Sequence, residues 1–193
     1  MLISKFDTNE IEKKIEEFEN KLQISLPEEY VKFMTKYNGG KTPETKFRIS
    51  KVNHKISSDV NGFYGMGQVD EDYSFDRLMN NQLLEEFIED GMIPIATNVW
   101  GDYITMGIAK KQYGKIFFLY HDRKKKYLSL CKDLNEFISK CKGEKIGHIR
   151  TIEERKQNMI ENGYGDMITE ESIKGWQEEI DWYAGIHQEE VVF

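Results

Sequence analysis

Cysteine is scarce in this chain of 193 residues, and long apolar runs are absent. The two cysteines, Cys131 and Cys141, form no disulfide framework and lack metal-ligand spacing. We interpret both as reduced, buried or half-buried side chains rather than as a disulfide or a nucleophile. No apolar stretch approaches the roughly 20 residues that cross a bilayer, and the first residues lack the apolar core of a signal peptide. These absences predict a cytoplasmic protein that binds no membrane.

Signatures of catalysis are missing as well. The four histidines are dispersed and form no metal-ligating pair, and there is no nucleophile elbow, phosphate-binding loop or kinase motif. Gly62, Gly65 and Gly67 stand in the wrong order for a dinucleotide fingerprint. We therefore predict a protein that is not an enzyme and that holds no metal and no cofactor.

One catalytic alternative remains open at His121 and Asp122, the only adjacent histidine and carboxylate. Successive side chains of a strand point to opposite faces, so these two form no pair unless the strand ends before them. Asp102 is a further candidate, although an Asp at a glycine turn more often binds nearby backbone N–H groups. An enzyme that uses these three side chains is the third hypothesis considered for the function.

The net charge of −7 is unevenly distributed along the chain. Residues 1–147 contain 23 basic and 23 acidic residues, whereas residues 148–193 contain 4 basic and 11 acidic ones. Within the first part, residues 51–100 hold 3 basic and 9 acidic groups, and residues 101–147 hold 11 and 5. A region of one sign steers partners of the opposite sign. The acidic surface serves either solubility alone or the binding of a basic partner.

Apolar residues at helical spacing predict a first helix over residues 9–22, capped by Asp7 or Thr8. Pro27 suits the first position of a second helix, because its missing N–H needs no partner there. The Asn-Gly-Gly run at residues 38–40 ends this helix, with a glycine in the left-handed conformation.

The middle of the chain gives weaker signals. They predict two short strands, over residues 46–52 and 62–66, around a polar loop at 53–61. Short helices follow near residues 75–79 and over 82–90. The acidic run before the first of these helices either complements its N-terminus or faces a basic partner.

The strongest β signal lies over residues 93–121, where three short apolar runs rich in Ile, Tyr and Phe alternate with turns. This pattern predicts an antiparallel meander. Pro94 cannot donate to a ladder, so we expect it at the first residue of its strand. Residues 98–102 form the first turn, in which Gly101 takes a positive φ. Residues 107–114 form the second turn.

Four consecutive cations at residues 123–126 follow the meander. We interpret them as a solvated turn, because no interleaved aromatic residues supply a stacking platform for nucleic acid. We thus expect no direct contact with nucleic acid. A strand over residues 127–131 and a helix that opens at Asp133 and stops at Gly143 complete the first domain.

Residues 148–193 look like an acidic helical extension. Thr151 opens a capping box for a helix that ends near Glu161, and Thr169 caps another helix. The second helix has one apolar face, made of Ile173, Trp176, Ile180 and Tyr183. That face is too apolar to stay in water, so we expect it to pack on the main domain or on a second chain. The last three residues either pair as an edge strand or fray.

The chain also contains an ordered set of short motifs. They are Leu26-Pro27-x-x-Tyr30-x-x-Phe33, Asn38-Gly39-Gly40, Ile93-Pro94-Ile95-Ala96, Trp100-Gly101-Asp102-Tyr103, Gly114-Lys115-Ile116-Phe117-Phe118 with His121-Asp122, and a closing helix through Phe137. In order and spacing this set resembles the SUKH superfamily, specifically its Smi/Knr-type branch. The resemblance covers residues 11–141, and nothing in it explains residues 148–193.

The resemblance implies an α+β domain over residues 1–147, with a mainly antiparallel sheet flanked by helices. Bacterial members are typically immunity proteins that neutralise secreted or contact-delivered toxins, often nucleases, by tight binding. Fungal relatives are scaffold-like regulators of cell-wall synthesis, so the fold alone does not fix the role. The family has no shared catalytic residues. Trp100, Gly101 and Asp102 match a family motif that we interpret as mainly structural.

The first hypothesis is therefore a non-catalytic antitoxin for a cognate protein toxin, a nuclease with a basic active-site face. The candidate contacts are acidic residues of two segments, Asp70, Glu71, Asp72, Asp76, Glu170, Glu171, Glu178, Glu179 and Asp181. The second hypothesis is an intracellular interaction adaptor without a toxin, which docks through the apolar face of the last helix. A homo-oligomer is compatible with both.

Overall fold

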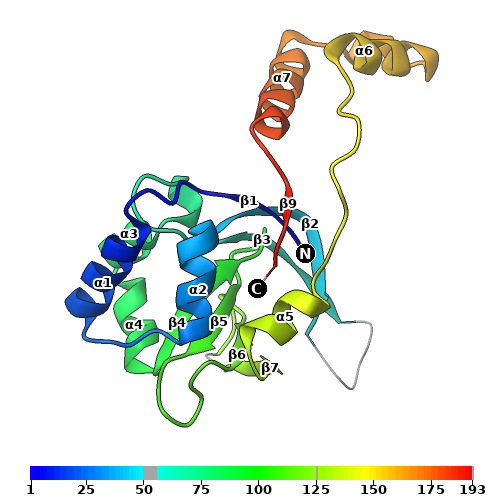
Figure 1. The fold of residues 1–193 in the computed structure, drawn as a ribbon. Helices are drawn as coiled ribbons and strands as arrows, with labels where there is room; N and C mark the ends of the chain where they lie inside the picture. Colours follow the sequence, from blue (N-terminus) through cyan, green and yellow to red (C-terminus); the bar gives the residue numbers. More distant parts are fainter. Residues whose placement is uncertain (50–55, 125, 193) are drawn as a thin grey trace. The chain divides into compact units, whose positions relative to one another are not determined.

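A computed structural model describes residues 1–49, 56–124 and 126–192. Contacts divide the chain into two units (Figure 1). The sheet unit consists of Met1–Glu144 and of the C-terminal residues from Gln188 on, and the helical unit consists of Lys145–His187. The predicted boundary at residue 148 grouped the end of the chain with the extension, whereas the contacts return this end to the sheet unit.

The sheet unit is built on one antiparallel sheet, which has nine strands among the described residues. The strands are β1 (Leu2–Lys5), β2 (Gly40–Arg48), β3 (Ser57–Phe63), β4 (Met92–Thr97), β5 (Tyr103–Gly107), β6 (Ile116–Leu119), β7 (Leu128–Cys131), β8 (Lys142–Gly143) and β9 (Glu189–Glu190). Their order is β7-β6-β5-β4-β3-β2-β1-β9, and β8 pairs with β2. The predicted α+β fold with an antiparallel sheet is confirmed.

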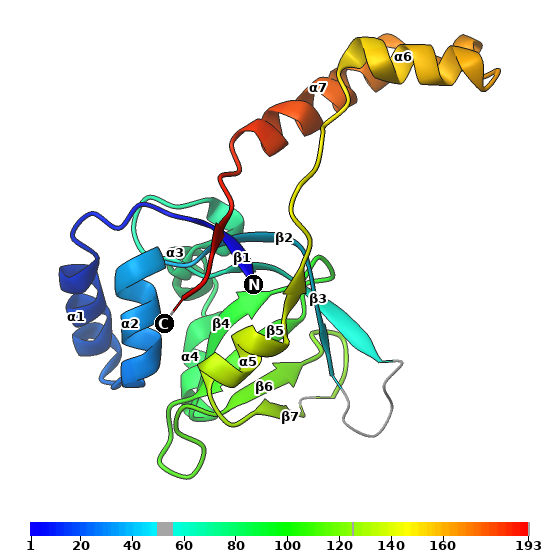
Figure 2. The ribbon, with the colours of Figure 1, turned by 45° about the vertical axis from the view of Figure 1, so that its right-hand side comes forward.

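Helices flank this sheet (Figures 1 and 2). They are α1 (Ile11–Leu22), α2 (Glu28–Tyr37), α3 (Phe75–Asn80), α4 (Leu83–Glu89) and α5 (Leu134–Lys140), with the 3-10 turn η1 (Glu71–Tyr73) before α3. Aromatic rings join the layers. Phe33 of α2 lies 5.0 Å from Phe63 of β3, and Phe137 of α5 lies 5.2 Å from Phe47 of β2, centroid to centroid. α2 and α5 thus each turn an apolar face to the core, to which Phe33 and Phe137 belong.

Asn38 ends α2 in a way that the sequence did not predict. Asn38 itself takes the left-handed conformation, with φ 50°, and its N–H donates to the Met34 carbonyl. Its side chain is fully buried: Nδ2 donates to the carbonyls of Asp7 and Met66, and Oδ1 accepts from the Met66 N–H at 2.9 Å. Gly39, with φ 75°, follows because a Cβ there would lie 2.5 Å from the Tyr64 carbonyl oxygen.

Three local predictions at the ends of elements are wrong. The predicted caps of α1 are not used, since Glu10 occupies the N-cap in the left-handed conformation without a side-chain bond. Pro27 is the N-cap of α2 rather than its first residue. Pro94 is the third residue of β4, at a register shift between Pro94 and Ala96, so its missing N–H falls beside a bulge.

The predictions for the middle strands are also wrong at their ends. β2 begins at Gly40, six residues before the predicted start, because it pairs with β1 as well as with β3. β3 covers Ser57–Phe63, most of which was assigned to a loop. Residues 50–52 of the predicted strand, residues 53–55 of the predicted loop, the cation at 125 and the last residue lie outside the described part of the chain.

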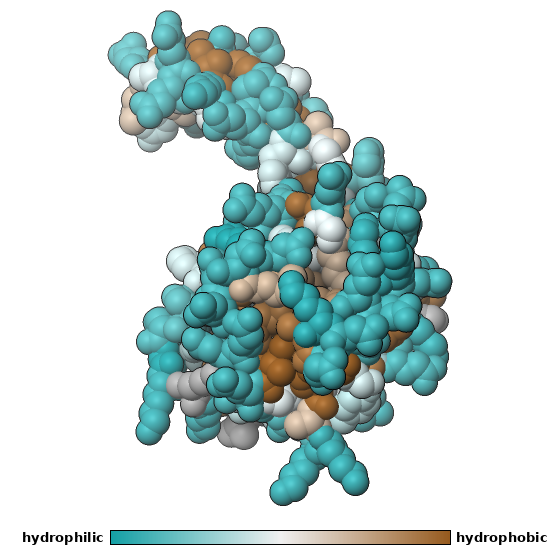
Figure 3. Space-filling model, turned by 90° about the vertical axis from the view of Figure 1, so that its left-hand side faces the viewer, coloured by the Kyte–Doolittle hydropathy of each residue, from teal (hydrophilic) through white to brown (hydrophobic). Residues whose placement is uncertain are grey.

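The helical unit contains α6 (Ile152–Glu161), the 3-10 turn η2 (Gly165–Met167) and α7 (Glu170–Ala184). Both helices open with the predicted caps, and both caps form a capping box. The predicted apolar face of α7 is half-buried, and no residue of either helix is buried. Figure 3 accordingly shows apolar side chains of the helical unit exposed among hydrophilic ones. Among the described residues, no helix has the length and apolarity that crossing a membrane requires.

Candidate binding site at the turn between β4 and β5

The turn between β4 and β5 is organised by the side chain of Asn98. Its Oδ1 accepts hydrogen bonds from the N–H groups of Trp100 and Asp102, at 3.0 and 2.8 Å. The Gly101 N–H donates to the Asn98 carbonyl, and Gly101 has φ 83°. The predicted turn and the positive φ of its glycine are confirmed. Because Asn98 is only 4% exposed, these bonds are shielded from water.

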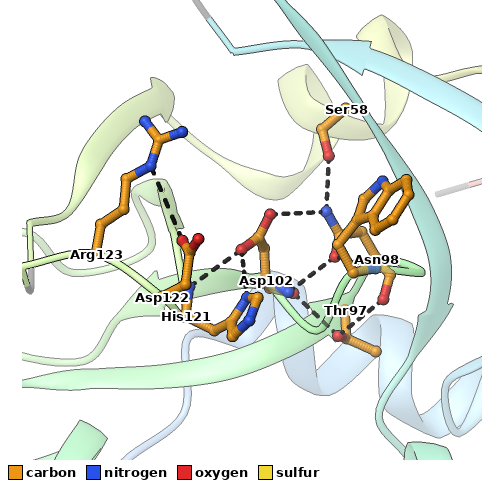
Figure 4. Close-up of polar contacts among 8 residues, drawn as sticks. Ser58, Thr97, Asn98, Asp102, His121, Asp122 and Arg123 are labelled. Atoms are coloured by element: carbon orange, nitrogen blue, oxygen red, sulfur yellow. Dashed lines mark hydrogen bonds and ion pairs between the residues drawn. The ribbon is translucent and has the colours of Figure 1, made fainter.

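Asp102 connects this turn to the end of β6 (Figure 4). Its Oδ2 accepts from Asn98 Nδ2 at 3.0 Å, and its Oδ1 accepts from the His121 N–H at 3.1 Å and lies 2.9 Å from His121 Nδ1. Asn98 Nδ2 also donates to Ser58 Oγ of β3. Burial opposes ionisation of the Asp102 carboxyl, but the bonds from His121 and Asn98 outweigh it and lower its pKa. The turn is therefore fixed to β3 on one side and to β6 on the other.

The structure brings together the three side chains of the catalytic alternative. One ligand atom each of Asp102, His121 and Asp122 lies within 4.8 Å of the others. β6 ends at Leu119, so His121 and Asp122 lie beyond the strand, and His121 pairs with Asp102 rather than with Asp122. Both hydrogen bonds that His121 directs at Asp102 reach the same oxygen. This geometry is that of a carboxylate that anchors two turns.

Two side chains of the turn face water. Trp100 is 73% exposed and Val99 is 60% exposed, whereas Asp102 is 7% exposed. The other family-motif residues divide in the same way: Gly101 is exposed, and the buried ones are Leu26, Pro27, Tyr30, Asn38, Gly39, Gly40 and Pro94. A structural role for the motif remains a prediction. The exposure of Trp100 gives the indole no packing role in the core.

A pocket of about 310 Å³ lies beside this turn. Val99 and Gly101 line it from the turn, and Asp72, Tyr73 and Arg77 line it from η1 and α3. Arg77 pairs with Asp72 in the pocket wall. β3 precedes the segment of η1 and α3 in the chain, and β4 precedes the turn. Because β3 pairs with β4, the sheet brings these two short segments together.

Tyr73 lines the pocket together with the carboxylate of Asp72. Burial first, and then the charges of Asp70, Asp72 and Asp59, raise the pKa of the Tyr73 hydroxyl to about 12. Asp59 also accepts the N–H of Val99 at 3.2 Å, which places a carboxylate directly at the turn. Three carboxylates, those of Asp59, Asp70 and Asp72, stand here against two cations, because Lys41 pairs with Asp70 and Arg77 pairs with Asp72, so the excess charge is negative.

The predicted acidic contacts of the sheet unit occupy one short segment. Asp70 caps η1 and pairs with Lys41 at 2.6 Å, and Asp76 stands in the first turn of α3. Asp72 lines the pocket beside the turn, whereas Asp76 lines a different hollow with Lys14. Glu71 is exposed. Their role in binding remains a prediction.

The predicted acidic contacts of the helical unit all lie on α7 and are exposed. Glu170 and Glu171 occupy its first turn. Glu179 pairs with Arg155 of α6 at 2.7 Å, Glu178 pairs with Lys174, and Asp181 accepts from Gln177. The two predicted groups of carboxylates thus belong to different units.

The sequence analysis missed Asn98, Asp59 and Tyr73. An Asn four residues before an Asp across a glycine turn is a signal that could have identified Asn98, because Asn side chains commonly mimic a backbone turn. No local signal could have identified Asp59 or Tyr73, since each meets the turn or its pocket only through the sheet.

Fold and site together define an α+β domain that presents an aromatic turn beside acidic groups. The family model of the SMI1 / KNR4 family (SUKH-1) matches residues 12–140, and the chain belongs to this family. The predicted resemblance is confirmed. Domains of this family bind partner proteins, commonly act as immunity proteins and are generally non-catalytic. A comparison with curated proteins finds no match to the chain.

Proposed function

We propose that this protein is a cytoplasmic immunity protein that binds and neutralises a cognate toxin, a nuclease, without catalysis of its own. The observation that carries the proposal is membership of the SMI1 / KNR4 family over residues 12–140. The matched region includes the turn between β4 and β5, its pocket and the acidic segment at Asp70–Asp76.

The charge distribution supports a nuclease as the toxin. A nuclease presents cations to phosphate, so a clustered acidic surface meets the same groups. Complementary charge of this kind raises association rates to the order of 10⁸–10⁹ M⁻¹s⁻¹ at low salt. Nine acidic and three basic residues lie within 51–100, the part of the chain that supplies most of the wall of the pocket.

The direct test is co-expression with the toxin encoded beside this gene. We expect cells that carry both to survive, a complex in a pull-down, and association that slows as salt rises. A wild-type protein that neither protects nor forms a complex would contradict the proposal.

Two matched variants locate the electrostatic contact. One neutralises four carboxylates of the sheet unit, Asp70→Asn, Glu71→Gln, Asp72→Asn and Asp76→Asn, and the other neutralises four of α7, Glu170→Gln, Glu171→Gln, Glu178→Gln and Asp181→Asn. Each variant removes four negative charges, so a difference between their association rates shows which of the two groups of carboxylates attracts the toxin. We expect the first to slow association roughly tenfold. Equal, unchanged rates in both would exclude steering by these carboxylates.

The second candidate function is an interaction adaptor without a toxin. The observation that favours it is the half-buried apolar face of α7, which suits a docking helix. An adaptor predicts that Trp176→Ala and Ile180→Ala abolish binding to a cellular partner while toxin protection is absent. A toxin gene next to this one, with protection, favours the antitoxin.

A further inference from the structure

Trp100 is an exposed indole on a turn that is held rigidly. Five hydrogen bonds within the turn involve the side chains or backbone of Asn98 and Asp102, and both side chains are nearly fully buried. An indole that is 73% exposed contributes little to the core. A rigid aromatic side chain loses little conformational entropy on binding, which is why tryptophan is enriched at the centres of protein interfaces.

The neighbouring pocket favours a cationic occupant. The Asp72 carboxylate lines it beside Tyr73, and the Asp59 carboxylate accepts the N–H of Val99, another lining residue, at 3.2 Å. Arg77 is the one cationic side chain among the described residues that line it. The Asp72–Arg77 pair stands at the surface, with the Asp72 side chain 75% exposed. Because such surface ion pairs are weak in water, an incoming cation displaces Arg77 from Asp72 easily.

We propose that Val99, Trp100 and the adjoining pocket form the anchor point for a protein partner, which inserts a Lys or Arg side chain at the Asp72–Tyr73 end and packs its neighbouring residues on the indole. The charge of the pocket selects the cation, and the ring of Tyr73, which lines the pocket, adds cation–π attraction. A pocket of about 310 Å³ is at the lower limit for small-molecule ligands and suits a single side chain better. The identity of this partner as the toxin rests on the proposed function.

A basic peptide tests the site without the toxin. The probe is hexa-arginine, added to the ¹⁵N-labelled full chain while the indole N–H resonances of its three tryptophans are followed, with hexa-glutamate as the control peptide. We expect hexa-arginine to shift the Trp100 resonance saturably, and Asp72→Asn to weaken this binding at least threefold. Glu178→Gln removes the same charge from α7 and leaves the Trp100 titration unchanged. An unmoved Trp100 resonance, or a titration indifferent to Asp72→Asn, overturns the proposal.

The toxin complex supplies the second measurement. We expect Trp100→Ala to raise the Kd at least tenfold without lowering the Tm, while Trp182→Ala, an exposed indole of the helical unit, changes the Kd less than twofold. If the wild type binds the toxin and Trp100→Ala binds equally well, the anchor is wrong and the proposed function stands. If the wild type binds no toxin, the proposed function fails, and the peptide titration decides the anchor. A homodimer that Trp100→Ala dissociates identifies a second copy as the occupant and also overturns the proposal.

Discussion

Tyr30, Phe33 and Phe63 of the sheet unit expose none of their surface, whereas Trp176 and Tyr183 of the helical unit are only half-buried. Both units nevertheless begin helices at or next to the predicted residues, with N-caps at Pro27 in the sheet unit and at Thr151 and Thr169 in the helical unit. The helical unit, all of which the structure describes, contains no buried residue at all. Local signals therefore place a helix in either unit, but only burial supplies the free energy that holds it.

The ion pairs of the helical unit do not compensate for this lack of burial. Arg155 and Glu179 join α6 to α7 at 2.7 Å, but the Glu179 side chain is 49% exposed. Exposed pairs of this kind contribute about 0–1 kcal/mol. We therefore expect the helical unit to open at a lower free energy than the sheet unit.

The largest effect is expected for Phe33→Ala. The substitution leaves a cavity between α2 and β3, and loss of a buried Phe typically costs about 3–5 kcal/mol of unfolding free energy. The measurement is urea unfolding followed by near-ultraviolet circular dichroism. Trp176→Ala is the matched control, because it truncates an aromatic residue of the helical unit. It should change the main transition by less than about 1 kcal/mol, and equal losses from both variants would refute the comparison.

A smaller effect is expected for Asn38→Ala. The substitution removes the hydrogen-bond partner of the Asp7 carbonyl and of the N–H and carbonyl groups of Met66. Buried polar groups that lose their partners cost about 1–3 kcal/mol of unfolding free energy. Gln82 also has a left-handed backbone, with φ 59°, but it is exposed and its side chain makes no cap bond. Gln82→Ala therefore measures the cost of placing alanine in the left-handed conformation alone. The difference in Tm between the two variants then gives the contribution of the Asn38 hydrogen bonds. A similar Tm for both would show that the Asn38 network is not stabilising.

The smallest effect concerns the acid stability of the turn. Because the pKa of Asp102 lies below its ordinary value of 3.8 in the folded protein, its ionised form stabilises the fold above that pH. This contribution is lost as the pH falls through the folded pKa. Asp102→Asn should lower stability at pH 7 by about 1–2 kcal/mol and flatten the pH dependence below 3.8. In Glu179→Gln, whose partner Arg155 likewise lowers the pKa of Glu179, the main transition should keep the wild-type slope. An unchanged slope in Asp102→Asn would contradict this prediction.

Helical periodicity, caps and turn residues in the sequence predicted α1, α2, α5, α6, α7 and the meander of β4, β5 and β6, because each depends on neighbours within a few residues. The ends of β2 and β3 were not predictable in this way. Their pairing involves β1, β4 and β8, which lie far away in the sequence. The choice between an edge strand and fraying, left open for residues 191–193, depends likewise on β1, which pairs with β9 at Glu189–Glu190, and on the Met1 carbonyl, which accepts the Val191 N–H at 2.9 Å.

The sequence by itself determined the class of fold, the family and the turn at residues 98–102. Only the tertiary structure decided that Asp102 joins His121, 19 residues away, and that Trp100 stands exposed on a turn whose Val99 and Gly101 share a pocket with Tyr73 and Asp72. The physical reason is that periodicity and turn chemistry act between near neighbours, whereas exposure and electrostatic potential depend on which distant strands the sheet brings together.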